Sequence, residues 1–291
     1  MTFRTLRPGQ RSQILIGSPT ASAATVLVET REMLVEAPNW SRDGRTLYLN
    51  GNGRLWSLDV AAPETGLQAV DHTDLLELNN DHVLDPDGEH IYLSAMDGHI
   101  YHAALSGGPA VRVTPHDDRW HFLHGVSPDG RRLAYVEIET FAQPGRLAVL
   151  NLRGGPPRIL PTGPGHIDGP EWSADGAWLY FNTEGFTVDA GHAQLARIAD
   201  AGSPVERLLD SPTVDWFPHL SPDGTLATYV SFPAGTLGHP ADLDVTVTVV
   251  GTGDWATPLQ RYSVFGGQGT LNVNSWAPDN SRFAFVAYPV D

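Results

Sequence analysis

One short phrase recurs six times along this chain of 291 residues. Its full form reads Ser-Pro-Asp-Gly, and the six variants begin at Ser41, Asp85, Ser127, Ser173, Ser221 and Ala277. The last residues of successive copies lie 44, 42, 46, 48 and 56 positions apart, and a short apolar run follows each copy. A period of about 40–50 residues with short strands is typical of β-propeller blades. We therefore predict an all-β fold, a six-bladed β-propeller.

The phrase has the composition of a tight turn between two strands. Proline presets φ at the first corner, aspartate can bond its own backbone, and glycine adopts a positive φ without a Cβ clash. Asn280 replaces the glycine in the last copy, and asparagine also tolerates this geometry. A large apolar residue precedes every copy, as a core position between blades requires: Trp40, Leu84, Val126, Trp172, Leu220 and Trp276. Each repeat is therefore predicted to hold an inner strand, a turn and a second strand.

The third strand of each blade is predicted after the hairpin, and a short fourth strand after that. Alternating apolar and polar residues, the pattern of a strand, occur at 54–59, 99–105, 146–151, 194–199 and 244–249. The last copy has no room for such a pair before Asp291, and the missing strands are predicted in the apolar segments 13–17 and 25–29. We expect one domain over residues 1–291, in which N-terminal strands at about 12–30 join the C-terminal blade and close the ring.

Composition argues against several classes of protein. The formal net charge is −16, and so acidic a surface repels phosphate backbones, so we expect no nucleic-acid partner. The chain has no apolar stretch long enough to span a membrane. The N-terminus has no apolar segment before a cleavage site, which predicts a cytoplasmic protein as the sequence stands and a periplasmic one if a leader has been removed. The absence of cysteine excludes disulfides and thiolate chemistry.

The repeated hairpins resemble those of the TolB-like β-propellers, whose WD40-like (PD40) repeats read Trp-Ser-Pro-Asp-Gly. Asn-Asn-Asp-His at 79–82, Trp-Phe-Pro-His at 216–219 and Gly-Gly-Gln-Gly-Thr at 266–270 resemble motifs of stand-alone bacterial members. The resemblance extends distantly to the propellers of oligogalacturonate lyases. It implies a ring whose first strands line a central channel, with ligands bound where the chain enters those strands. It does not imply one activity, because such propellers include protein-binding scaffolds, domains that gate peptidases and metal-dependent lyases.

The segments that lead into the inner strands are rich in polar side chains. Five of the twelve histidines fall in them, namely His82, His121, His124, His166 and His219. A ring brings equivalent positions of its blades around one axis, and imidazole with carboxylate suits a divalent ion. We predict an axial Mn, Ca or Zn site formed by His82, His124 and His219, with Glu171 as fourth ligand. We expect neither a nucleotide, because no Walker motif or dinucleotide fingerprint occurs, nor haem.

Two other sets of residues are candidates at the channel mouth. Ligand contacts are predicted from Asn80, Asp81, Trp120, Asp168, Trp216, Gln268, Asn272 and Asn274. The candidate catalytic bases are His121, His166 and Glu171. Each of these residue types also has a structural interpretation, because aspartate caps turns, tryptophan packs under a rim, and histidine near a strand end bonds its neighbours.

Two functions remain open. The first is a binding module that presents a polar, histidine-rich channel mouth to a small molecule, a glycan or a partner protein. The second is a metal-dependent carbohydrate-active enzyme, a lyase or hydrolase, with its site on the propeller axis. The chain has no Gly-x-Ser-x-Gly nucleophile elbow, which disfavours a serine hydrolase. We favour the binding module, because this fold supports many functions and catalysis needs its own evidence.

The fifth repeat is longer than the others by an insertion within residues 231–243. Three placements are open for this segment: over a blade edge, against a neighbouring molecule, or across the channel. A structural or assembly role through the outer edge of a blade is a third hypothesis.

Overall fold

The six turn phrases adopt the conformation that their residues predict. The computed structural model describes residues 3–75 and 77–291. In it, the fourth residue of every phrase has a positive φ, from 62° at Asn280 to 79° at Gly88. In four copies the serine hydroxyl donates to the aspartate two positions later, at 2.6–2.7 Å. The turns are thus closed by their own side chains, and each directs the chain from an inner strand into the next strand.

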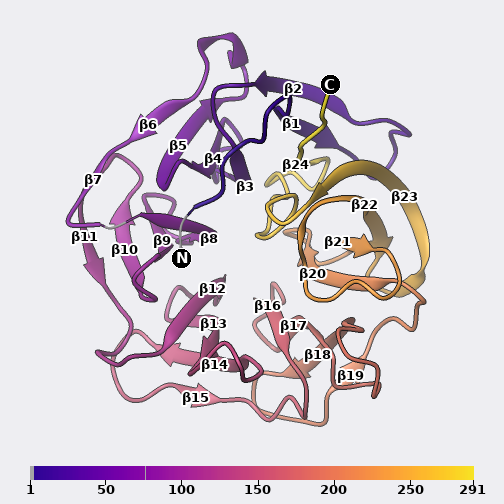
Figure 1. Ribbon diagram of the computed structural model, residues 1–291. Coiled ribbons are helices and arrows are strands. Elements are labelled where there is room, and N and C mark those ends of the chain that lie inside the picture. The colour runs from indigo at the N-terminus through magenta and orange to yellow at the C-terminus, as the bar shows by residue number, and fades with distance from the viewer. Residues whose placement is uncertain (1–2, 76) are drawn as a thin grey trace.

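Six β-sheets surround a central axis (Figure 1). Blade one holds β3 (Val35–Trp40), β4 (Thr46–Gly51), β5 (Arg54–Asp59) and β6 (Gln68–Val70). Blade two holds β8 (Leu78–Leu84), β9 (His90–Ala95), β10 (Ile100–Ala104) and β11 (Gly108–Arg112), with β7 (His72–Thr73) parallel to β11. Blade three holds β12 (Trp120–Val126), β13 (Arg132–Ile138), β14 (Arg146–Asn151) and β15 (Arg158–Ile159).

The remaining blades follow the same order from the axis outwards. Blade four holds β16 (Ile167–Trp172), β17 (Trp178–Thr183), β18 (Gln194–Ala199) and β19 (Glu206–Arg207). Blade five holds β20 (Val214–Leu220), β21 (Leu226–Phe232) and the long hairpin of β22 (Ala241–Gly251) and β23 (Asp254–Gly267). A single 3-10 turn, η1 (Pro63–Thr65), is the only helical element in the described ranges. The all-β, six-bladed prediction is confirmed.

The last blade combines both ends of the chain. Its sheet has the order β2 (Thr25–Thr30), β1 (Ser12–Gly17), β24 (Phe283–Ala287), and β1 pairs antiparallel with β24 from Gln13–Ala287 to Gly17–Phe283. The predicted closure of the ring by N-terminal strands is therefore confirmed. The innermost segment of this blade, residues 268–276, is not a regular strand. It meets β24 through an isolated bridge between Trp276 and Phe283, and the N–H groups of Ala284 and Val286 donate to the carbonyls of Ser275 and Thr270.

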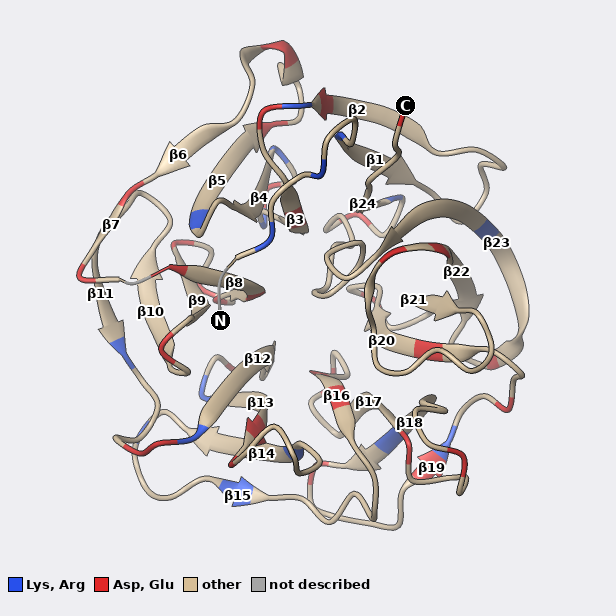
Figure 2. Ribbon diagram, viewed as in Figure 1, with Lys and Arg blue, Asp and Glu red and all other residues tan. Residues whose placement is uncertain are grey.

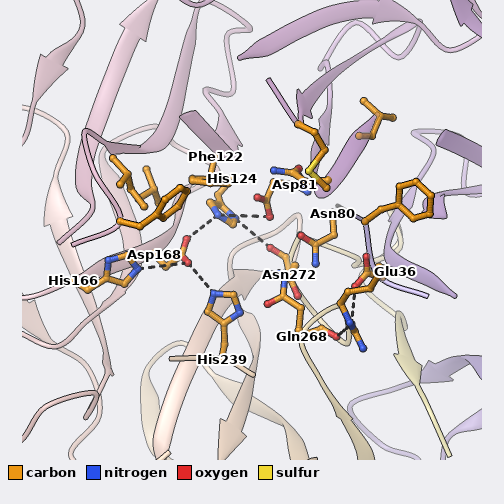
Figure 3. Close-up of a pocket in the computed structure, with 18 residues that line it drawn as sticks. Glu36, Asn80, Asp81, Phe122, His124, His166, Asp168, His239, Gln268 and Asn272 are labelled. Carbon is orange, nitrogen blue, oxygen red and sulfur yellow. Dashed lines mark hydrogen bonds and ion pairs between the residues drawn. The ribbon is translucent and has the colours of Figure 1, made fainter. Parts of the chain in front are cut away.

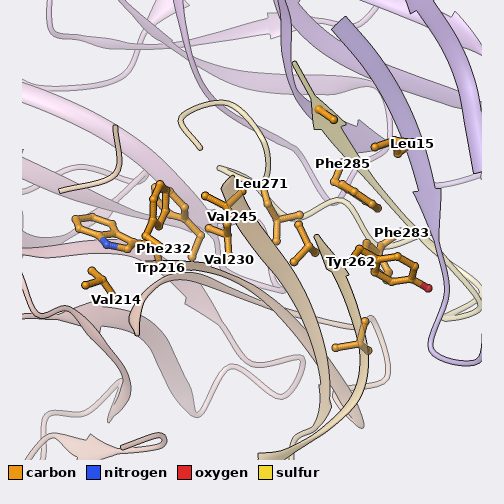
Figure 4. Packing of buried hydrophobic residues seen from close by; sticks show 14 of the residues in the cluster. Leu15, Val214, Trp216, Val230, Phe232, Val245, Tyr262, Leu271, Phe283 and Phe285 are labelled. Atoms are coloured by element: carbon orange, nitrogen blue, oxygen red, sulfur yellow. The ribbon is translucent and has the colours of Figure 1, made fainter. Parts of the chain in front are cut away.

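The hydrophobic core lies between neighbouring blades. The tryptophans that precede three of the phrases, Trp40, Trp172 and Trp276, are 6%, 5% and 4% exposed. One of the core clusters joins blade five to the last blade, where the rings of Phe283 and Phe285 lie beside Tyr262 (Figure 4). Each such buried ring contributes about 1.5–3 kcal/mol. The blades are thus held to one another by the residues that flank the turns.

Five inner strands carry a register irregularity at the same place, just before the turn phrase. Three of these irregularities contain a residue with positive φ followed by proline: Ala37 at 54°, Gly169 at 62° and Phe217 at 58°. A bulge bends a strand and re-aims its side chains. For alanine and phenylalanine this backbone costs about 1–3 kcal/mol, so the surrounding structure has to hold it in place. The bulges decide which polar residues face the axis.

Acidic residues are distributed around the whole ring rather than gathered on one blade (Figure 2). This spread agrees with a net charge of −16 that mainly favours solubility. Nothing in residues 3–75 or 77–291 has the length and hydropathy of a membrane-spanning helix.

Candidate functional site

A cavity of about 360 Å³, here called the axial cavity, lies where the inner strands converge (Figure 3). Its apolar wall comes mainly from blades two and three: Leu78, Met96, Phe122, Val136, Ile138 and Phe141, with Phe3 beside them. Its polar lining comes from five blades, the N-terminal segment and the loop before β22: Arg4, Glu36, Asn79, Asn80, Asp81, His124, His166, Asp168, His239, Gln268 and Asn272. This volume falls in the range of small-molecule sites.

The central contact of the axial cavity joins His124 of β12 to Asp168 of β16. His124 Nε2 lies 2.8 Å from Asp168 Oδ1, and His124 Nδ1 donates to the carbonyl of Asn272 at 3.2 Å. Burial alone would lower the pKa of His124, but the charges of Asp168 and Asp81 outweigh it and raise this pKa to about 9. The imidazole therefore carries a proton on both nitrogens at neutral pH.

Asp168 is surrounded by three imidazoles. His239 Nε2 lies 3.4 Å and His166 Nε2 lies 4.0 Å from Asp168 Oδ2. The backbone N–H of Gly169 donates to Asp168 Oδ1 at 2.8 Å. Burial would raise the pKa of Asp168, but the charge and hydrogen bond of His124, with the contact to His239, hold this pKa well below its usual value. Asp168 is thus a permanent carboxylate that organises the polar wall.

Asp81 of β8 differs from Asp168 because no described residue lies within hydrogen-bond distance of its carboxylate. Its one ion-pair contact within the described ranges is to His124 Nε2, at 3.9 Å, which is longer than a hydrogen bond. Burial raises the pKa of Asp81 to about 6, although the charge of His124 opposes the shift. Near neutral pH, Asp81 therefore offers the axial cavity a buried carboxylate with unused acceptor capacity.

A second ion pair borders the axial cavity where the N-terminal segment meets β3. Arg4 Nη1 contacts Glu36 Oε1 at 2.7 Å and also donates to the carbonyl of Gln268. The Arg4 guanidinium lies 4.9 Å above the ring of Tyr288. Asn50 donates to the other oxygen of Glu36 at 3.2 Å. Glu36 is therefore neutralised by its neighbours and has little left to offer a ligand.

A separate set of polar residues, here called the buried network, consists of Glu171, His219, Leu220 and Asn274. His219 Nδ1 lies 2.7 Å from Glu171 Oε2, while Glu171 Oε1 accepts from the N–H of Leu220 at 3.0 Å and from Asn274 Nδ2 at 2.7 Å. His219 Nε2 lies 3.3 Å from the carbonyl of Leu271. None of the four residues lines the axial cavity in the described structure. Their polar groups are hydrogen-bonded to one another and join blade four, blade five and the last blade.

His82 and His121 also lie outside the lining of the axial cavity. His82 is fully buried, its Nδ1 donates to Asn39 Oδ1 at 2.8 Å, and burial lowers its pKa to about 3. His121 is 1% exposed, donates through Nδ1 to the carbonyl of Gly98 at 2.7 Å, and packs against the ring of Tyr135. Both side chains are therefore held as parts of the blades.

The predicted metal ligands do not fit a divalent ion in this arrangement. Both ring nitrogens of His124 face hydrogen-bond acceptors, and so do both nitrogens of His219. A metal ligand needs a free lone pair on one nitrogen, and of the three only His82 retains one, on Nε2. Across residues 3–75 and 77–291, no group of three or more histidine, aspartate or glutamate side chains is placed to hold a metal ion.

The structure thus sorts the predicted residues into two groups. The axial cavity is lined by His124, His166, Asn80, Asp81, Asp168, Gln268 and Asn272. Two predicted ligand contacts that do not line the cavity are tryptophans. The ring of Trp120 stacks on that of Phe122 with 6.2 Å between centroids, and the ring of Trp216 packs against that of His239 with 4.6 Å between centroids. Asn274 belongs to the buried network. Tryptophan at these positions supplies packing, and the predicted bases His121 and Glu171 are likewise held by structural contacts.

Sequence reasoning missed several residues of the axial cavity, including His239, Glu36 and Arg4. His239 lies in the insertion before β22, which therefore reaches the axis rather than only an outer edge. Glu36 could have been found, because it stands five positions before its turn phrase, as do four cavity residues from other blades: Asn80, Phe122, Asp168 and Asn272. No repeated position points to His239 or Arg4.

Comparisons with known proteins agree with this architecture. No family model matches the chain. The chain is 37% identical over 289 residues to the protein Atu1656 of Agrobacterium fabrum, which covers 94% of this chain and 95% of that protein. The structure of a candidate TolB from Agrobacterium tumefaciens has a TM-score of 0.87 at 37% identity, over 97% of this chain and 99% of that one.

Two more distant structures share the fold alone. TolB of Acinetobacter baumannii has a TM-score of 0.60 at 14% identity, over 96% of this chain and 66% of that one. An oligogalacturonate lyase solved with manganese has a TM-score of 0.54 at 14% identity, over 92% and 77%. The ring and its cavity define a six-bladed β-propeller with a polar axial pocket. The chain belongs to the TolB-like family of β-propellers.

Proposed function

We propose that this protein is a binding module that holds a small amphipathic molecule in its axial cavity. The observation that carries the proposal is a cavity of about 360 Å³ that is lined both by apolar side chains and by charged side chains from several blades. Apolar pockets with a few fixed polar groups are typical of ligand sites. The ion pairs of His124 and Glu36 hold the polar side in shape, which lowers the ordering cost of binding.

The alternative, a metal-dependent carbohydrate-active enzyme, has no comparable support. A general base has to be unprotonated at working pH, whereas the pKa of His124 is raised to about 9 by Asp168 and Asp81. His166 accepts a hydrogen bond at Nδ1 from the N–H of Gly145 at 2.9 Å, so its Nε2 is the donor that faces Asp168. His124 and His166 therefore present N–H donors rather than bases, and these suit the recognition of a ligand.

A screen of small molecules tests the proposal. Sugars, amino acids, amines and carboxylates are added singly to the protein, and the melting temperature is measured. A ligand at 100 times its Kd stabilises the folded state by about 2.7 kcal/mol, which corresponds to a shift of several degrees. The effect should be lost in His124→Gln, with Asp81→Asn as a second cavity variant if His124→Gln does not fold.

An exposed histidine–aspartate pair provides the matched control. His90 Nδ1 lies 2.7 Å from Asp87 Oδ2 in the turn of blade two, outside the axial cavity. His90→Gln should retain any ligand effect. The proposal is wrong if no compound stabilises the wild type, or if the cavity variants respond as strongly as the control. Turnover of a compound by the wild type, lost in His124→Gln, would instead support an enzyme.

A further inference from the structure

The charges around the axial cavity do not balance. Glu36 is paired with Arg4 at 2.7 Å, and Asp168 is paired with the imidazolium of His124 at 2.8 Å. The carboxylate of Asp81 remains. Its contact with His124 Nε2 is 3.9 Å long, and that nitrogen already donates its proton to Asp168. Within the described part of the chain, the cavity therefore holds one carboxylate without a counter-charge of its own.

A neighbouring side chain also lacks a partner. Asn80 is 6% exposed and lines the axial cavity, and its Nδ2 has no hydrogen-bond partner among the described residues. Figure 3 shows Asn80 close to Asp81 on the polar side of the cavity. A buried polar group without a partner is costly and calls for an explanation. A ligand with a donor for Asp81 and an acceptor for Asn80 would satisfy both groups.

Another part of the lining of the axial cavity is apolar. Phe122, Val136 and Ile138 line it from blade three, and Leu78 and Met96 line it from blade two. A charged or strongly hydrated group of a ligand would lose water against these apolar side chains without gaining a hydrogen bond. A ligand that matches both the polar and the apolar part of the lining therefore has a small polar head and an apolar body.

We propose that the axial cavity binds primary amines that carry a compact apolar group. The ammonium group donates to the carboxylate of Asp81, and the apolar group packs against Phe122 and Ile138. An oxygen near the nitrogen would accept from Asn80 Nδ2. This inference rests on the proposed function and names the class of ligand for the same cavity.

The electrostatics favour a cation over an anion or a neutral polyol. The groups that face Asp81 from the other elements are His124, Asp168, His239 and Glu36. Glu36 is paired with Arg4 and Asp168 with His124, so the charge of Asp81 decides: it repels an incoming carboxylate and attracts an ammonium. A hydrogen bond between two charged groups in a buried site is roughly twice as strong as a neutral one.

Three phenyl compounds that differ in one group test the proposal. Phenethylamine is a cation, 2-phenylethanol is neutral and phenylacetate is an anion at pH 7.5. Their Kd values are measured on the full chain by NMR titration. We expect phenethylamine to bind at least about tenfold more tightly than 2-phenylethanol, and phenylacetate to bind most weakly.

The variant Asp81→Asn keeps the shape of the side chain and removes its charge. It should abolish the preference for phenethylamine, so that the amine and the alcohol bind within about twofold of each other. Asp87→Asn removes the same charge from an exposed turn and should retain the preference. Phe122→Leu makes the apolar part of the lining smaller and should weaken the binding of all three compounds by a similar factor.

The outcomes separate this inference from the function on which it rests. The inference fails if 2-phenylethanol or phenylacetate binds the wild type as tightly as phenethylamine, if none of the three binds, or if Asp81→Asn keeps the preference. If a neutral or anionic compound binds and His124→Gln removes that binding, the binding module stands and only the preference for amines is wrong. If neither this series nor the broader screen finds a ligand, both proposals fail.

Discussion

The pair of His219 and Glu171 and the pair of His124 and Asp168 are both buried in this ring, but their surroundings differ. In the buried network, both oxygens of Glu171 are used by His219, Leu220 and Asn274. In the axial cavity, the pair of His124 and Asp168 lies beside the carboxylate of Asp81, which has no close partner among residues 3–75 and 77–291. Similar side chains thus serve two purposes. In the buried network every hydrogen-bonding group has a partner, and the pair joins blades. In the axial cavity the carboxylate of Asp81 remains available, and the pair forms part of a proposed ligand site.

The largest expected effect is on the buried network. Glu171→Ala leaves the His219 ring, the N–H of Leu220 and the amide of Asn274 without their acceptor, and should lower the free energy of unfolding by about 3–5 kcal/mol. Urea denaturation at pH 7 measures this change. Glu206→Ala, at an exposed pair with Arg197, serves as the control and should cost less than about 1 kcal/mol. Equal losses in the two variants would contradict the structural role of the network.

The second prediction concerns the pH dependence that His124 gives to stability. Its folded pKa, about 9, is higher than its ordinary 6.5, so its contribution is complete below pH 6.5 and is lost as the pH rises through 9. The contribution amounts to about 3 kcal/mol at most. Urea denaturation of the wild type and of His124→Gln at pH 6, 7.5 and 9 should show a difference that shrinks as the pH rises. A constant difference would mean that Asp168 and Asp81 do not hold the proton on this ring.

The third prediction has the opposite sign. Because burial raises the pKa of Asp81 from 3.8 to about 6, the ionised carboxylate destabilises the folded protein above pH 6. Asp81→Asn should therefore raise the free energy of unfolding at pH 7.5, by about 3 kcal/mol at most. The gain should fall to about a third at pH 4.5, where the unfolded chain also begins to bind the proton.

Thermal or urea unfolding of Asp81→Asn at the two pH values measures this gain. A loss of stability at pH 7.5 would show that Asp81 has a protein partner and would weaken the comparison between the two regions. A gain would identify a residue whose charge is kept at the expense of stability, as is common in binding sites.

The smallest effect is expected at the surface. His90 and Asp87 lie as close to each other as His219 and Glu171, at 2.7 Å, but both are about 40% exposed. Water screens such a pair, so His90→Gln should change the free energy of unfolding by less than about 1 kcal/mol. Urea denaturation measures it beside Glu171→Ala. A change as large as that of Glu171→Ala would mean that burial does not separate the two kinds of pair.

The fold could be predicted because its signal is repeated. Each turn phrase closes one blade, so six weak local patterns reinforce one another, and the apolar residue before each phrase marks the core. The strand pairing of the last blade could also be predicted. The last turn phrase is not followed by a third and fourth strand, and the N-terminal segment holds two strands that belong to no other blade. Repetition therefore carried both the number of blades and the closure of the ring.

The site was harder to predict because a strand changes face at every residue. Asp81 lines the axial cavity, whereas its neighbour His82 turns to Asn39, and a bulge next to them shifts the register. Histidines at similar distances from their turn phrases therefore do not share one surface. His239 arrives from an insertion without a counterpart in other blades, so no alignment of repeats could place it.

The pairing of Gly17 with Phe283 has a consequence for how the protein is made. During translation the strand β1 leaves the ribosome long before its partner β24, because the strands of five blades lie between them in the sequence. Until then, the earlier blades stand as an open series with exposed edges, and contacts of such long sequence separation form slowly. We expect the emergence of β24, rather than synthesis of any earlier blade, to set the moment at which the axial cavity first exists.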